Sequence, residues 1–148
     1  ELRLRHGDFI VVPSFTWRVP HVAGKYLSDK EKRLAMHAGH AETALMLALA
    51  PDTVHMERAV ANFPPPFPSK ILSGDGRPAC AWTARDFGPS GVIGDPLQAT
   101  REQGEDILDT LSASWVEAIT DLFHMQWVVR DVPSWGYGHQ QGHIQQTL

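Results

Sequence analysis

The chain has 148 residues, 43% hydrophobic and 20% charged, which is typical of one soluble globular domain and excludes a coiled coil or a chain disordered throughout. Thirteen Lys and Arg against 17 Asp and Glu give a net charge of −4, so we expect neither nucleic acid nor a membrane as a partner. The single Cys80 excludes a disulfide framework, and no apolar run approaches the roughly 20 residues that span a bilayer; we expect a cytoplasmic protein.

The first residues predict the middle of an α/β unit. Residues 1–8 are typical of a helix end, with Gly7 at the C-cap position. The continuous apolar run 9–12 predicts a strand buried on both faces, extending over about residues 9–15. The chain then leaves the sheet at its carboxyl edge, where open α/β sheets bind ligands.

Two helices are expected next. Ser28-Asp29-Lys30-Glu31 fits a capping box and predicts a short helix over 29–35. After a break at 36–39, strong helix formers predict a second helix over 41–50, which Pro51 ends. Because this second helix is apolar nearly all round, we expect it to be buried.

A third helix is the clearest element of the chain. Asp95 as N-cap and Pro96 at the first helical position predict that it covers 97–123. Its apolar side chains recur at helical spacing and are Leu108, Leu111, Trp115, Ile119 and Leu122. Gly104 costs up to about 1 kcal/mol relative to Ala inside a helix, which indicates close packing against another backbone. The tail 124–148 is expected to be weakly ordered.

The densest polar cluster is the segment 37–43, between the first two helices. Its spacing fits a helix start in which Glu42 complements the helix dipole. His37 and His40 could alternatively bind a metal, although a metal site also needs a second cluster of ligands. Cys80 lacks a basic or His neighbour that would indicate a nucleophile.

Two longer patterns are more specific. The first runs from His37 to Val54 and reads His-Ala-Gly-x-x-Glu-Thr-Ala-Leu-Met-Leu-Ala-Leu-x-Pro-Asp-x-Val. The second holds Gly94-Asp95-Pro96, Ala99-Thr100 and Gly104-Glu105, and the Pro-rich Phe63-Pro64-Pro65 lies between the two. Together they resemble the creatininase (creatinine amidohydrolase) family over about residues 9–123.

The resemblance implies a fold and an activity. The fold would be α/β, a three-layer α/β/α architecture with a mainly parallel sheet, and the protein would be a homo-oligomer. The activity would be metal-dependent hydrolysis of a C–N bond in a cyclic amide or a related small substrate. Two divalent ions, Zn or Mn, would polarise the carbonyl and supply hydroxide.

The metal-ligand motifs of the family are missing from this sequence. Neither the family's Glu-x-His nor its Asn-Gly-His-x-(Glu/Asp)-Asn segment occurs. We therefore expect the chain to be the carboxyl-terminal half of a creatininase-like protein, with residues 1–123 as part of one domain. The chain by itself should bind no metal and be inactive. We also expect it to pack against the missing amino-terminal half or against another copy of itself.

The resemblance also assigns roles to three residues, and a fourth candidate, His40, occupies a position that varies in the family. His37 matches the histidine that acts as proton donor or transition-state stabiliser, and Glu42 matches a residue that orients this histidine or its loop. Trp17 would line the substrate pocket or else belong to the core, and His40 could contact substrate. Residues 33–36 depart from the acidic and Trp pattern of creatininase, so creatinine is not the expected substrate. The alternative function is a non-catalytic creatininase-like subunit for binding or assembly.

Overall fold

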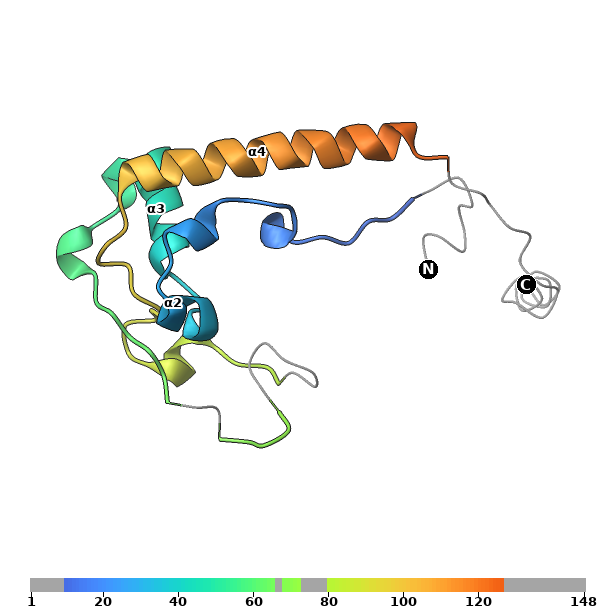
Figure 1. Cartoon of the computed structure of the whole chain (residues 1–148). Coiled ribbons are helices and arrows are strands. Elements are labelled where there is room, and N and C mark those ends of the chain that lie inside the picture. The colour runs from blue at the N-terminus through green and yellow to red at the C-terminus, as the bar shows by residue number, and fades with distance from the viewer. Residues whose placement is uncertain (1–9, 66–67, 73–79, 127–148) are drawn as a thin grey trace, which may run out of the picture.

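The computed structural model describes residues 10–65, 68–72 and 80–126. In this part of the chain three α-helices dominate, and Figure 1 shows α4 as a long rod with α3 against its first turns and α2 farther from it. Their bounds are α2 (Asp29–Leu34), α3 (His40–Leu49) and α4 (Arg101–His124). Short 3-10 helices punctuate the connections: η1 (Thr16–Arg18), η2 (Ala23–Lys25), η3 (Pro51–Thr53), η4 (Met56–Arg58) and η5 (Ala84–Phe87).

The start of α2 is the predicted one. The Oγ atom of Ser28 accepts a hydrogen bond from the backbone N–H of Glu31 at 3.1 Å. This satisfies one of the free amides of the first turn. The Glu31 side chain, however, does not return to the Ser28 backbone; it makes other contacts, described below.

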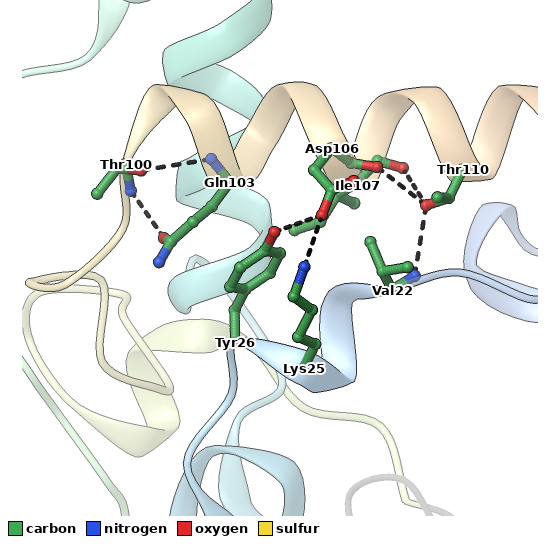
Figure 2. A network of polar contacts seen from close by, with 8 residues as sticks. All are labelled: Val22, Lys25, Tyr26, Thr100, Gln103, Asp106, Ile107 and Thr110. Atoms are coloured by element: carbon green, nitrogen blue, oxygen red, sulfur yellow. Dashed lines mark hydrogen bonds and ion pairs between the residues drawn. The ribbon is translucent and has the colours of Figure 1, made fainter.

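The predicted start of α4 at Asp95 and Pro96 is wrong. The Asp95 carboxylate accepts a hydrogen bond from Leu97 N–H at 3.1 Å, and the N–H of Ala99 reaches the Pro96 carbonyl at 3.0 Å. These bonds close turns, so the helix begins later, at Arg101. Its N-cap Thr100 and Gln103 form a reciprocal capping box, which Figure 2 shows at the start of α4.

The contact between α3 and α4 is the centre of the fold. An added Cβ at Gly104 would overlap the carbonyl oxygen of Ala44 and lie 3.0 Å from the Cβ of Ala48. The prediction that Gly104 packs against another backbone is therefore confirmed. Ala44 and Ile107 are fully buried at this crossing, and Leu111 extends the small core along α4.

Helices α3 and α4 each bury one side and leave apolar side chains exposed on another. In α3, Met46 and Leu49 are 44% and 60% exposed, so the prediction that the whole helix is buried is wrong. In α4, Leu111 is buried as predicted, but Ile119 is 47% exposed. Within the described residues, α3 packs against α4, and the buried cluster around this contact includes Leu111 but not Ile119.

The predicted interior strand at 9–15 does not form within the described residues. Residue 9 lies outside them, and 10–15 form no β-ladder. Ile10, Val11 and Val12 are 41%, 50% and 53% exposed. A strand requires a neighbouring strand for its backbone groups, and the described pairings are two isolated antiparallel bridges elsewhere, His37 with Ile93 and Asn62 with Gly94. The parallel sheet is therefore not confirmed.

Some sequence predictions lie outside the described residues. These are the helix end at 1–8 and most of the tail, residues 127–148. Of the helices in the described ranges, none is both long enough and apolar enough to cross a bilayer.

A polar network ties the segment 16–26 to α4. Figure 2 shows Lys25 and Tyr26 reaching toward Asp106, with Val22 close to Thr110. The Tyr26 hydroxyl donates a hydrogen bond to the Asp106 carboxylate, and the Lys25 ammonium lies 3.4 Å from the same oxygen. Val22 N–H donates to the Thr110 hydroxyl at 3.3 Å. The hydrogen bond from Tyr26, with the Lys25 cation, lowers the pKa of Asp106 below its ordinary value.

Replacing Gly104 by Ala is expected to destabilise the protein. Alanine is the better helix former by about 1 kcal/mol, but its methyl group would collide with Ala44. We expect G104A to lower the free energy of unfolding by about 1–3 kcal/mol, measured by urea denaturation. Ser112→Ala, at an exposed position of the same helix, should change it by less than about 0.5 kcal/mol. A G104A protein as stable as the wild type would contradict the close α3–α4 contact.

The Asp106 network predicts an acid-dependent contribution to stability. Because the pKa of Asp106 is lower in the folded state, its ionised form stabilises the fold above the ordinary carboxyl range. That contribution is lost as the pH falls through the folded-state pKa. Asp106→Asn should therefore be less stable than wild type at pH 7, and the difference should shrink toward pH 3 in thermal unfolding. Asp109→Asn, an exposed carboxylate of α4, is the control. A pH-independent deficit in D106N would contradict this account.

Candidate functional site

His37 lies in the loop between α2 and α3, with its backbone held and its side chain exposed. The N–H of His37 donates to the carbonyl of Ile93 at 3.3 Å, and the N–H of Ile93 donates back to the His37 carbonyl at 2.8 Å. Met36 N–H donates to the same Ile93 carbonyl at 2.8 Å, and Ile93 is fully buried. The imidazole is thus presented from a fixed backbone.

The next residue, Ala38, has an uncommon backbone conformation. Its φ is +51°, in the left-handed region that non-glycine residues seldom adopt. A carboxylate oxygen of Glu42 accepts its N–H at 2.6 Å, and the Thr43 hydroxyl lies 3.5 Å from its carbonyl oxygen. These contacts from the first turn of α3 offset the strain. Glu42 therefore contacts the loop that carries His37.

Two cavities meet at His37, Glu42 and Trp17. The first has a volume of about 320 Å³ and is also lined by His21, Lys32 and Met36, among others. The second has a volume of about 650 Å³, and α3 and residues 53–55 supply most of its wall, with Leu45, Met46, Leu49, Thr53 and Val54 among them. The structure therefore brings three of the four sequence-predicted site residues to one place.

Trp17 belongs to a cavity wall and to the core at the same time. Its ring packs edge-on against His21, with centroids 5.2 Å apart, and it also packs against the buried cluster. The segment is held to α4 because the Trp115 indole N–H donates to the Thr16 carbonyl at 3.0 Å. The two interpretations of Trp17 from the sequence are therefore compatible.

The side chain of His40 points to α4 and does not line the two cavities. It is 7% exposed, and its Nε2 lies 2.8 Å from the side-chain oxygen of Gln103 on α4. It is not among the residues lining the two cavities. The structure thus places His40 in the α3–α4 interface, and a contact with substrate stays a prediction.

Three residues near the site were missed by the sequence analysis. Glu31 is 4% exposed and lines the first cavity together with Lys32 and His21. The Nδ1 atom of His21 is buried without a hydrogen-bond partner among the described residues. The sequence carried no signal for these roles: the capping-box pattern explained Glu31 within its own helix, and one of its two partners lies 64 residues away.

The implied metal centre does not fit the described residues by themselves. Within residues 10–65, 68–72 and 80–126, no group of three His, Cys, Asp or Glu side chains is placed to hold an ion. A two-metal site requires several such ligands to converge. Within the described part of the chain, His37 and Glu42 therefore line a pocket and have no further ligands beside them that would complete a metal site.

Comparison with known proteins places this geometry in a family. No curated protein matches the chain. Among solved structures, a suggested creatinine amidohydrolase from Bacteroides fragilis NCTC 9343 is 20% identical, with 86% of this chain and 48% of that chain covered and a TM-score of 0.68, which shows a shared fold. A creatinine amidohydrolase (creatininase) is 31% identical, with 84% and 49% covered and a TM-score of 0.58.

A mutant creatininase of the Zn-Zn type is also 31% identical, with 82% of this chain and 48% of that chain covered and a TM-score of 0.57. The chain thus spans about half the length of the solved structures that it matches. The family model described as Creatininase, creatinine amidohydrolase, matches residues 1–119. This chain belongs to the creatininase family.

Proposed function

We propose that this chain supplies the proton-donating histidine and part of the substrate pocket of a metal-dependent amidohydrolase. The observation that carries the proposal is the placement of His37. Its imidazole is exposed where two cavities meet, while its backbone is paired with the buried Ile93. Family membership supports the reaction class.

Hydrolysis of an amide C–N bond needs a proton at the leaving nitrogen. Without it, the departing group would be a strongly basic amide anion, so general acid catalysis contributes about 10²- to 10⁴-fold. In the proposed reaction the protonated His37 imidazole donates to this nitrogen. Glu42 keeps the loop in place through the Ala38 N–H, which limits the positions that the imidazole can sample.

The pocket walls favour a small amide with an apolar part. Trp17 lines both cavities, and Met36 lines the first. Lys32 adds one cation to the first cavity. His40 would act on this pocket indirectly, by holding the start of α3 against α4 through its hydrogen bond with Gln103.

The metal ions and the assembly belong to the same proposal. Solved relatives are described as Zn-Zn and Mn forms, and the ligands for two such ions would come from residues other than those described here. We further propose that a homo-oligomer or a second polypeptide segment covers the apolar side chains that stay exposed along α4, and that the protein works in the cytoplasm.

A second candidate function is a non-catalytic subunit for binding or assembly. The specific observation in its favour is that no metal-ligand cluster occurs among the described residues. The pocket and the helix surfaces could then serve recognition alone. The two functions differ in whether metal-loaded protein hydrolyses any amide.

Replacement of His37 by Ala tests the catalytic proposal. In the complete, metal-loaded protein, assayed on small cyclic amides that include creatinine, H37A should lower kcat by about 10²- to 10⁴-fold, because it removes the proton donor. Metal content, measured by mass spectrometry, should not change. His124→Ala, an exposed histidine at the end of α4, should retain activity. A variant that loses its metal would instead identify His37 as a ligand.

The 148-residue chain on its own should be inactive and bind no pair of metal ions. The described residues hold no ligand cluster, and exposed apolar side chains such as Val116, Ile119 and Phe123 favour association. Metal analysis and light scattering should therefore give no stoichiometric zinc or manganese and a mass above that of the monomer. A monomer with two bound ions would refute this proposal.

A further inference from the structure

Glu31 is a buried carboxylate whose two oxygens serve two distant segments. Oε1 accepts the N–H of His40 at 2.7 Å, and Oε2 accepts the N–H of Asp95 at 2.8 Å. The residue is only 4% exposed. A buried carboxylate is tolerated when charge-assisted hydrogen bonds replace its lost hydration, and this one has such a bond at each oxygen.

The backbone around Glu31 is built from residues that leave room for it. An added Cβ at Gly39 would overlap Oε1 of Glu31, and one at Gly94 would lie 2.9 Å from the same atom. Both loops thus approach the carboxylate closely because they carry glycine there. Each loop also carries one partner of the backbone bridge between His37 and Ile93: Gly39 follows His37, and Gly94 follows Ile93.

The same carboxylate also completes the start of α3. The N-cap of this helix is Gly39, which has no side chain to accept a hydrogen bond. The oxygen of Glu31 accepts the first helical N–H, that of His40, and its charge complements the positive end of the helix. A residue from α2 thereby performs the capping that the sequence of α3 cannot.

We infer that Glu31 is a positioning residue for His37. The His37–Ile93 bridge lies between the two amides that Glu31 binds, three residues before His40 and two residues before Asp95. By holding both amides, Glu31 fixes the bridge and with it the direction in which the imidazole is presented. The catalytic part of this inference rests on the proposed function.

The position requires a group with two acceptors. A glutamine has the same shape but offers one acceptor oxygen and one NH₂ donor. In Glu31→Gln, the NH₂ group would face one of the two backbone N–H groups, so one hydrogen bond is lost and a donor meets a donor. The variant therefore removes the double contact without creating a cavity.

The test uses the intact protein with Glu31→Gln and, as matched control, Asp29→Asn, which neutralises an acidic residue in the first turn of the same helix. Hydrogen exchange of the His40 and Asp95 amides, followed by NMR, should accelerate about tenfold or more in one or both positions in E31Q and stay unchanged in D29N. Glu31→Asp, which keeps the charge on a shorter stem, replaces E31Q if that variant fails to fold.

Kinetics then separate positioning from a general structural role. E31Q should lower kcat at least about tenfold with KM within about twofold, and it should have no further effect when His37 is already Ala. An equal loss of kcat in the H37A background, or unchanged amide exchange in E31Q, overturns the inference. If the wild-type protein hydrolyses no amide, the proposed function fails, and the exchange experiment still decides whether Glu31 holds the two loops.

Discussion

The fold depends on a backbone-to-backbone contact between α3 and α4 at Gly104. Because this residue has no side chain, α4 approaches the carbonyl of Ala44 closely, and the small core forms around this crossing. The same crossing fixes the direction of α3, whose first turn begins directly after the His37 loop. The geometry of the site is therefore set partly by a glycine two helices away from it in sequence.

Local sequence signals predicted the helices well, whereas the predicted parallel sheet is not confirmed. Ser28, the break at 36–39 and Gly104 all correspond to observed features, since capping and close packing depend on neighbours in the chain or on one contact. The start of α4 was misplaced because Asp95-Pro96 and Thr100-x-x-Gln103 both resemble helix starts. The strand at 9–15 could not be decided locally, because a strand is defined by partners that no window of its own sequence contains.

In the site too, the residues within the family motif were predicted, whereas the contacts between distant segments were not. His37, Glu42 and Trp17 were identified through the family motif, and the structure brings them to the two cavities. Glu31 was assigned to its own helix cap, because its true partners, His40 and Asp95, lie 9 and 64 residues away. His40 was named as a possible substrate contact because it lies near His37 in the sequence, but its side chain contacts Gln103 of α4 instead. Distance along the chain, more than residue type, limited what could be inferred.

The left-handed backbone of Ala38 makes the His37 loop depend on a contact from α3. A glycine at position 38 would adopt the same left-handed conformation without penalty. The chain instead has an alanine there, directly after His37, and this alanine is strained in that conformation. With alanine, the unfolded chain has fewer conformations to lose, while the folded loop depends on the Glu42 carboxylate to stay in its basin. The conformation of Ala38 is thus coupled to α3: when the first turn of this helix unfolds, the loop loses the Glu42 contact and keeps the backbone pairing of His37 with Ile93.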